Sequence, residues 1–261
     1  TLVLDGNASF ANYAGGQISI NNGSVLQIQN SHFFQNKTFV FDGNGGGNID
    51  IGSGNNVFRA DNTFTTLGGS QDTITQSSTW GLNCDNFGTR TFNVADGSDS
   101  VDLLISAQIS NNGSVVKDGA GTMALAAANT YSGGTTVDGG TLLVNNACGS
   151  GAVNVNATAT RGGTGTIAGL VTVASTGHVS PGDNSGDTLT LSDGLTLENG
   201  SVLDIAVDTS GSDDDLISIT GGTFTGAGTG GVTVNVTLST TAEGTYTLMD
   251  WTGADLADGV A

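Results

Sequence analysis

The chain has 261 residues, of which 43 are glycine and one is proline, and 36% of its residues are hydrophobic. Its formal net charge is −19, with 24 acidic residues and only five basic ones. So few basic residues cannot form the positive patch that nucleic acids or anionic lipid surfaces require, which argues against both as partners. High glycine without proline argues against collagen and proline-rich disorder, and no apolar run approaches the roughly 20 residues of a membrane span.

Residues 1–113 predict short strands separated by turns rich in Gly, Asn and Asp, the residues that turns favour. Within these strands alternate residues are apolar, which predicts one buried and one solvated face. The expected strands are Thr1–Leu4, Gln17–Ile20, Ser24–Ile28, Thr38–Phe41, Asn48–Ile51, Asn56–Phe58, Thr63–Leu67, Asp72–Thr75, Arg90–Val94 and Val101–Ile105.

A dense group of phenylalanines in this part is expected to stack in the core; the alternative is an interface patch. The group comprises Phe33, Phe34, Phe39 and Phe41.

The piece Ser77 to Gly88, which holds Trp80, Cys84 and Phe87, is less regular. We interpret it as a loop or a side excursion from the solenoid. Loops on a regular scaffold often carry function, so this piece is the first candidate for a specific contact surface.

The stretch Val115 to Asn146, VVKDGAGTMALAAANTYSGGTTVDGGTLLVNN, predicts strands of about three to five residues between glycine turns, near the low end of the usual range. Strands this short gain stability by stacking in register, as in a solenoid. Asn129 is expected to be an inward ladder residue or a turn cap, and Tyr131 a packing aromatic.

The same stretch resembles the autotransporter-associated β-strand repeat. Later segments follow that family's order: GGTGTIAGLVTV, GHVSPGDNSGDTLTL, NGSVLDIAV, DDLISITGG and the closing YTLMDWTG. The resemblance covers Ser114 to Gly253, whereas residues 1–113 match only in texture. The residues that carry the repeat are Lys117, Gly119, Gly121, Thr122, Leu125, Asn129, Thr130, Tyr131, Gly133, Gly134, Thr135, Val137, Gly140, Thr141 and Leu142.

The resemblance implies an all-β fold, a right-handed parallel β-helix exported by a bacterium. We divide it into N-terminal solenoid rungs (1–113), an autotransporter-repeat-like β-helix (114–222), and C-terminal strands with a tail (223–261), forming one continuous elongated domain. In the last section, strands are expected at Val232–Leu238 and Thr245–Met249.

No catalytic centre is predicted. Serine–histidine chemistry would need His32 or His178, and His178 lies in a Gly-rich turn with no nucleophile-elbow motif beside it. Cys84 and Cys148 cannot form a metal site by spacing. They are expected to be independent, buried small residues, since in a solenoid they would lie several rungs apart.

Calcium is the one metal to consider, because aspartate and backbone carbonyl oxygens are its preferred ligands. Neither the EF-hand spacing nor the nonapeptide calcium repeat is present. The simpler interpretation is turn aspartates and a solvated acidic surface. The weak candidates are Asp208 with Asp213, Asp214 and Asp215, Asp183 with Asp187, and Asp42 with Asp50.

The predicted function is structural: a secreted or cell-surface protein that assembles with copies of itself into a fibre or surface layer. Solenoid ends expose unpaired N–H and C=O groups, so end-to-end stacking or strand addition would join the copies. The alternatives are a monomeric adhesin that binds glycans or cell surfaces, a carbohydrate-active β-helix enzyme, and a fragment of a longer passenger protein.

Overall fold

The structure is a computed structural model of the chain. It describes residues 1–4, 16–30, 33–42, 44–54, 57–58, 62–79, 81–85, 88–182, 187–207, 214–227, 230–238, 246–251 and 255–256. Every helix or strand assigned in these residues is a β-strand.

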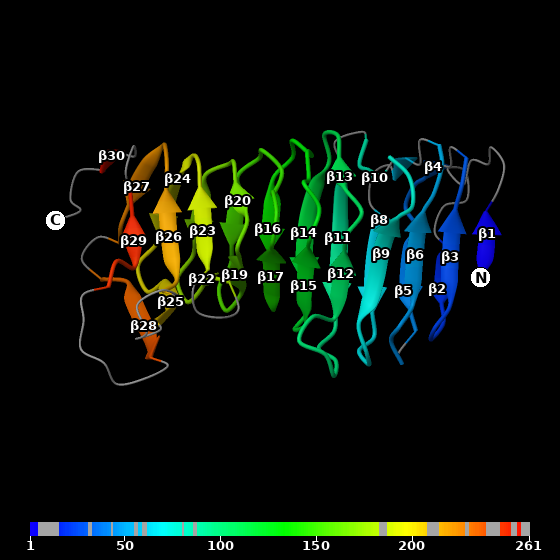
Figure 1. The fold of residues 1–261 in the computed structure, drawn as a ribbon, viewed down its shortest axis with the longest axis horizontal. Helices are drawn as coiled ribbons and strands as arrows, with labels where there is room; N and C mark the ends of the chain where they lie inside the picture. Colours follow the sequence, from blue (N-terminus) through cyan, green and yellow to red (C-terminus); the bar gives the residue numbers. More distant parts are fainter. Residues whose placement is uncertain are drawn as a thin grey trace.

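The strands wind into an elongated three-sided solenoid in which each turn adds one strand to each long side (Figure 1). All pairings between these strands are parallel. The first long side, sheet 1, contains in spatial order β1 (Leu2–Leu4), β3 (Val25–Ile28), β6 (Asn48–Ile51), β9 (Asp72–Gln76), β12 (Leu103–Ile105), β15 (Thr122–Leu125), β17 (Thr141–Val144), β19 (Thr160–Gly163), β22 (His178–Pro181), β25 (Val202–Val207) and β28 (Thr233–Leu238).

Sheet 2 forms the second long side, also with eleven strands. Its members are β2 (Gln17–Ile20), β5 (Thr38–Phe41), β8 (Asn62–Thr66), β11 (Thr89–Val94), β14 (Ser114–Asp118), β16 (Thr135–Val137), β18 (Val153–Val155), β21 (Val171–Val173), β24 (Gly194–Leu197), β27 (Thr223–Thr225) and β30 (Asp255–Leu256).

The third side is split into two four-stranded sheets. Between them it narrows to single bridges, Ala128 to Ala147 and Ala147 to Thr166. The two sheets contain β4 (Phe33–Phe34), β7 (Val57–Phe58), β10 (Leu82–Asn83) and β13 (Ile109–Ser110), and then β20 (Thr166–Ile167), β23 (Thr188–Leu191), β26 (Leu216–Ile219) and β29 (Met249–Asp250).

The core is a set of inward ladders that repeat from rung to rung. Phe39, Phe64 and Phe92 are register partners in sheet 2, and their rings stack with centroids 4.9 Å apart at both steps. Phe34 meets Phe39 edge to face at 5.4 Å, and Phe41 is fully buried. Offset and edge-to-face packing is how aromatic rings gain most from contact. The predicted core stacking is therefore confirmed for these residues, while the side chain of Phe33 lies outside the described part.

The corner that leads into sheet 1 contains a stack of residues whose backbone has the left-handed conformation. Thr158, Thr176, Gly200 and Gly231 have φ of 64°, 61°, 83° and 79°. The backbone N–H of each of the first three donates to the carbonyl of the next in the stack, over 2.9, 2.9 and 3.0 Å. A β-branched residue rarely adopts positive φ, so the stacked register holds the two threonines in a conformation that local preference opposes.

Most of the predicted strands agree with the structure to within one or two residues, and the parallel β-helix is confirmed. Two predictions are wrong. Of the described residues of Thr245–Met249 only Met249 lies in a strand, β29, and the described middle of the piece Ser77 to Gly88 is not a loop. Leu82 and Asn83 form β10, which pairs with β7 and β13, and the side chains of Leu82 and Cys84 are buried. The irregular composition hid a strand too short for period-two alternation to show. Trp80, Phe87 and His32 lie outside the described residues.

Candidate functional site: a hydroxyl-lined groove on sheet 1

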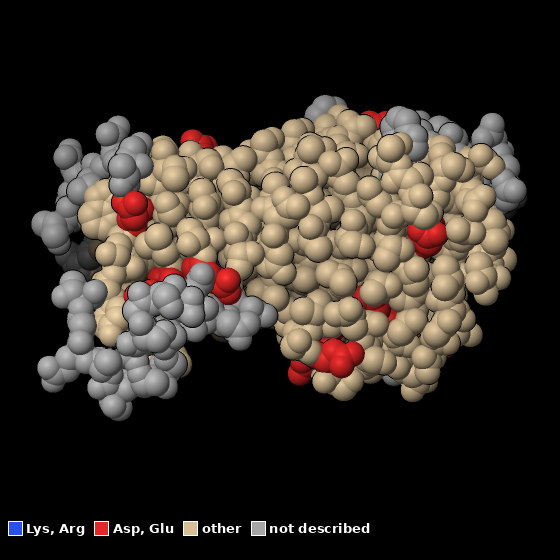
Figure 2. All heavy atoms as spheres, viewed as in Figure 1, with Lys and Arg blue, Asp and Glu red and all other residues tan. Residues whose placement is uncertain are grey.

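The exposed charged side chains of the described residues are almost all acidic. Four of the five basic residues, Lys37, Arg90, Lys117 and Arg161, are at most 5% exposed. The fifth, Arg59, is outside the described residues. Asp and Glu are accordingly the charged side chains seen on the face in Figure 2. A ligand that depends on exposed cations, such as a phosphate or a sulfate, finds none on the described surface.

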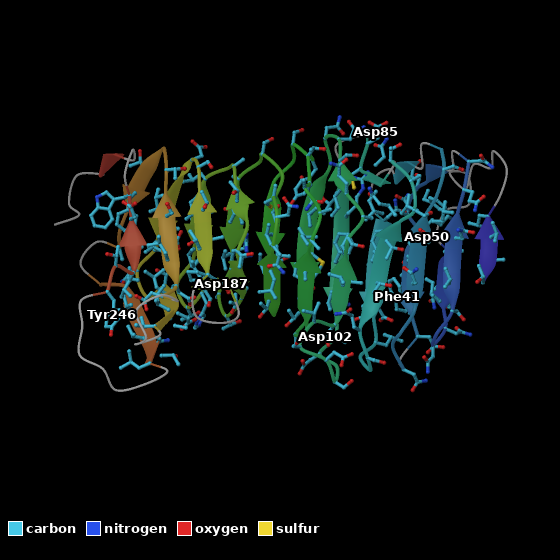
Figure 3. The ribbon with its side chains drawn as sticks, in the orientation of Figure 1. Phe41, Asp50, Asp85, Asp102, Asp187 and Tyr246 are labelled. Atoms are coloured by element: carbon cyan, nitrogen blue, oxygen red, sulfur yellow. The ribbon has the colours of Figure 1, made fainter. Side chains whose placement is uncertain are left out.

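A groove of about 220 Å³ lies on the outer face of sheet 1, near the middle of the solenoid. The space-filling view shows the lower part of this face recessed there (Figure 2). In the view of Figure 3, Asp102 and Asp187 lie on opposite sides of β17. The residues that line the groove are Ser100, Val101, Thr122, Thr141, Leu143, Thr160, Gly162, Ser180 and Gly182.

Strand register places three threonines in one row of this groove. Thr122, Thr141 and Thr160 are partners on β15, β17 and β19, and each is half-buried and faces outward. Parallel strands lie about 4.8 Å apart, so the three residues repeat at that spacing along the solenoid axis. A threonine hydroxyl both donates and accepts hydrogen bonds. The row therefore offers a regular series of bifunctional polar groups.

The floor beside this row is apolar. It is formed by Leu143 and Gly162, which are register partners at the next outward positions of β17 and β19. Leu143 is 8% exposed although it faces outward. Gly162 keeps the floor low, because an added Cβ would stand 3.0 Å from both Leu143 Cδ2 and the Ser180 carbonyl oxygen.

A second cavity of about 240 Å³ adjoins the groove and shares Ser180 and Gly182 with it. Asp204 lines this cavity. Its Oδ2 lies 2.5 Å from His178 Nδ1, and its Oδ1 accepts a hydrogen bond of 2.7 Å from Asn235 Nδ2. The two carboxylate oxygens are therefore already engaged by side chains of neighbouring rungs.

His178 had been expected in a Gly-rich turn, which is wrong. It is the first residue of β22, and its pairing with Val202 sets it beside Asp204. The turn before it is over at Gly177, so the glycine-rich composition places the end of the turn one residue too late. This His–Asp contact has no signal in the sequence, because the two residues lie 26 positions apart.

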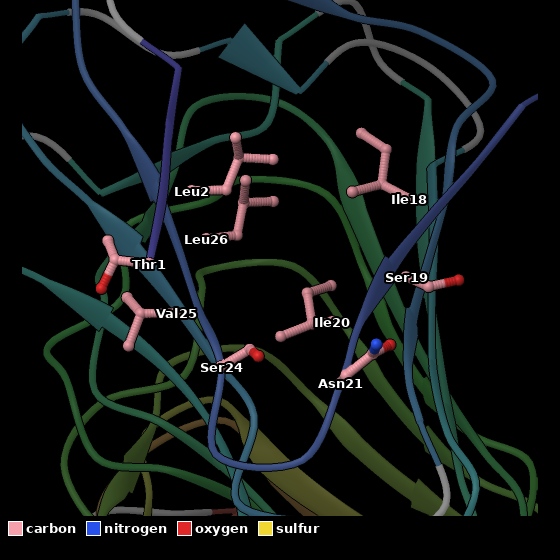
Figure 4. Close-up of a pocket in the computed structure, with 9 residues that line it drawn as sticks. All are labelled: Thr1, Leu2, Ile18, Ser19, Ile20, Asn21, Ser24, Val25 and Leu26. Carbon is pink, nitrogen blue, oxygen red and sulfur yellow. The ribbon is translucent and has the colours of Figure 1, made fainter.

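The solenoid ends form a different kind of surface. At the N-terminal end of the described rungs, a cavity of about 290 Å³ opens between β1, β2 and β3 (Figure 4). Its walls include Leu2, Ile18, Ile20 and Leu26. At the other end, β28 has one paired strand, β25, and all six of its residues are exposed. Apolar side chains are thus exposed at both ends of the described rungs, where β1 and β28 each pair with one other described strand.

The predicted calcium ligands are only partly described, since Asp183, Asp208 and Asp213 lie outside the described residues. Asp215 is 2% exposed, and its carboxylate accepts backbone N–H groups of Ala206 at 2.8 Å and Asp187 at 3.2 Å. It therefore holds two neighbouring chain segments together.

Asp187, whose backbone N–H takes part in that contact, and Asp214, which precedes Asp215 in the chain, are half-buried. Asp42 follows β5 of sheet 2, while Asp50 lies within β6 of sheet 1. Within the described ranges, no group of three or more His, Cys, Asp and Glu side chains is arranged to hold a metal ion. The calcium site stays a prediction.

Lys117, part of the repeat motif, has a role that sequence reasoning missed. It occupies the inward position after Phe92 in the same ladder. Its Nζ donates to the carbonyl oxygens of Asp118, Gly119 and Gly139 at 3.0, 2.8 and 2.9 Å. One ammonium with three donors therefore joins the turns of two successive rungs. Burial lowers its pKa from 10.5 to about 8, against the opposing effect of Asp118 and Asp102.

Two other residues of the motif act as expected. Asn129 Oδ1 accepts the Ile109 N–H at 2.8 Å, and its Nδ2 donates to the Ala147 carbonyl at 2.9 Å, so it links three rungs. Tyr131 is fully buried, and its hydroxyl contacts Cys148 Sγ at 3.0 Å. Cys84 and Cys148 are both free and buried, as predicted.

The fold and a sequence match together define the class of protein. Residues 115–144 match the passenger-associated-transport-repeat family. The chain therefore contains an autotransporter passenger repeat folded as part of a parallel β-helix, which confirms the resemblance. The described residues include no helix able to cross a membrane.

A more particular likeness is to the protein described as Adhesin BmaC autotransporter, from Brucella suis biovar 1 (strain 1330). The two are 44% identical over 86 residues. The alignment covers 32% of this chain but 2% of that protein, so the matched part is a small fraction of the relative's length.

Proposed function

We propose that this chain is a rigid, adhesive rod of a bacterial protein that is secreted or held at the cell surface. The observation that carries the proposal is the passenger repeat at residues 115–144, set within a continuous parallel solenoid. Passenger repeats and an adhesin relative imply an exported bacterial protein. The relative's description as an adhesin supports attachment, and not catalysis, as the role.

The physical properties of the rod suit surface exposure. Eleven strands on each long side keep the backbone hydrogen bonds inside the solenoid. The buried basic residues leave an acidic exterior, and like charges limit clumping between copies. Groups that contact a partner then lie on the sides, where the rungs repeat.

Adhesion is tested by displaying the chain on a non-adherent bacterium through a heterologous outer-membrane anchor. The control displays an unrelated β-solenoid of similar length, with display levels matched by an epitope tag. We expect several-fold more bacteria bound to epithelial monolayers than with the control. Equal binding of the two strains would contradict the adhesive role.

Assembly into a fibre or surface layer is the second candidate, favoured by the composition of the two ends. Leu2 and Val3 are 60% and 45% exposed at one end, and Val236 and Leu238 are 46% and 55% exposed at the other. Strands at both ends run in the same direction, so a second copy can add in parallel, head to tail. Such a heterologous contact does not close and produces filaments.

Sedimentation velocity and electron microscopy of the purified chain test this assembly. Leu2→Asp and Leu238→Asp place a charge at either end, whereas Leu67→Asp is the matched control, because Leu67 is 54% exposed away from the ends. The expected result is filaments for the wild type and the control, and single rods for the two end variants. Single rods for the wild type at tens of micromolar would refute self-assembly.

A further inference from the structure

We propose that the groove on sheet 1 binds an uncharged glycan chain that lies along the solenoid axis, across successive rungs. This inference rests on the proposed adhesive function and assigns the binding site and the ligand class. It is carried by the threonine row, the apolar floor and the lack of lysine or arginine among the described residues that line the groove.

The polar row matches a ligand that carries hydroxyl groups at a regular repeat. Thr122, Thr141 and Thr160 stand on three consecutive strands, at about 4.8 Å intervals. Each hydroxyl can donate to one ligand hydroxyl and accept from another. A partner with repeating hydroxyls can therefore contact every rung, whereas a compact ligand would use only one or two.

The floor provides the second part of sugar recognition, a surface for the C–H face of the ring. Leu143 lies between Ala124 and Gly162 in the outward row next to the threonines. Polar groups along one side and an apolar strip along the other give the groove the mixed lining that small-ligand sites have. The groove and its neighbour, of about 220 and 240 Å³, together fall within the usual size range of such sites, about 300–1,000 Å³.

Charge decides between neutral and anionic glycans. None of the described residues that line the two cavities is a lysine or an arginine. Asp204 and Asp215 line the second cavity, and His178 is engaged by Asp204. A uronate or sulfate would meet negative charge with no cation to offset its desolvation, which disfavours anionic chains.

The same geometry disfavours a polypeptide strand. Peptides that join a sheet do so at an unpaired strand edge, through backbone hydrogen bonds. The groove lies over β15, β17, β19 and β22, and each of these strands is already paired on both sides. Recognition must therefore come from side chains, and those available are mainly hydroxyls.

The test uses the whole chain with four hexasaccharide probes: cellohexaose, maltohexaose and chitohexaose as neutral chains, and hexagalacturonate as the anionic comparison. Binding is measured by titration calorimetry and located by amide chemical-shift changes. The double variant Thr141→Val with Thr160→Val removes two hydroxyls at nearly constant shape. Its matched control is Thr136→Val with Thr172→Val, which alters two half-buried, outward threonines of sheet 2.

At least one neutral probe should bind, with shift changes at β15, β17 and β19. The groove variant should bind it about 5- to 150-fold more weakly, the range expected for the loss of two hydrogen bonds. The control variant should bind as the wild type does. Failure of all three neutral probes, equal loss in both variants, or equal binding of hexagalacturonate would overturn the proposal.

The adhesion assay separates this proposal from the one on which it rests. If displayed wild-type chain and groove variant adhere equally above the unrelated solenoid, the adhesive function stands and the groove is not its site. If the wild type does not exceed the solenoid control, the adhesive function itself fails.

Discussion

Asp72 is the buried carboxylate whose ionisation opposes folding. It is 1% exposed in sheet 1, and Oδ1 accepts the Gly47 N–H at 2.9 Å. Burial raises its pKa from 3.8 to about 6, the Gly47 hydrogen bond opposes that rise, and the charge of Asp102 adds to it. We therefore expect Asp72→Asn to remove a pH-dependent destabilisation.

The direction of the change in stability with pH follows from the linkage between protonation and folding. A carboxyl whose pKa is higher in the folded state binds its proton more tightly there, so its stabilising contribution is complete below the unfolded pKa and is lost as pH rises through about 6. A shift of about two units corresponds to about 3 kcal/mol in total. Roughly half of this, about 1.4 kcal/mol, falls between pH 5 and pH 8.

The assay is urea unfolding followed by circular dichroism at pH 5, 6, 7 and 8, for wild type and Asp72→Asn. The stability of the variant relative to wild type should rise by about 1.4 kcal/mol across this range. Asp138→Asn, at an exposed aspartate bonded to Asn156, is the control and should show no comparable trend. A flat difference for Asp72→Asn would refute the assignment of a costly buried charge.

Four other residues or pairs make further predictions, each checked by urea unfolding unless stated. Phe64→Ala breaks both steps of the phenylalanine stack and should cost about 3–5 kcal/mol; a loss below about 1 kcal/mol would contradict close packing there. Lys117→Met should cost about 2–4 kcal/mol, because three turn carbonyls lose a charged donor. Arg161→Met should instead be neutral or stabilising by about 1–3 kcal/mol, since Nε and Nη2 of this buried side chain have no hydrogen-bond partner among the described residues. A stabilising Lys117→Met together with a destabilising Arg161→Met would contradict both assignments. Cys84 and Cys148 should react with a thiol reagent only after unfolding, and rapid reaction of the folded chain would show that a thiol is accessible.

The strands and the solenoid could be predicted because their signals are local. Asn48–Ile51 alternates polar and apolar residues, and the glycines before it permit the turn; both features act within a few residues. Stacking of Phe39 in the core was predicted, but its partners Phe64 and Phe92 were not, since the sequence does not say which residues on successive rungs are partners.

What the sequence by itself determined was therefore the strand pattern, the acidic exterior and, through the resemblance to the passenger repeat, the parallel solenoid. The tertiary structure decided the position of β10, the contact between His178 and Asp204, the carbonyl contacts of Lys117 and the threonine row of the groove. The physical reason is register. Alternation tells which face of a strand is buried, but turn length and core packing decide which residue of the next rung lies beside it. A groove built from one residue per rung comes into being only when that register is set.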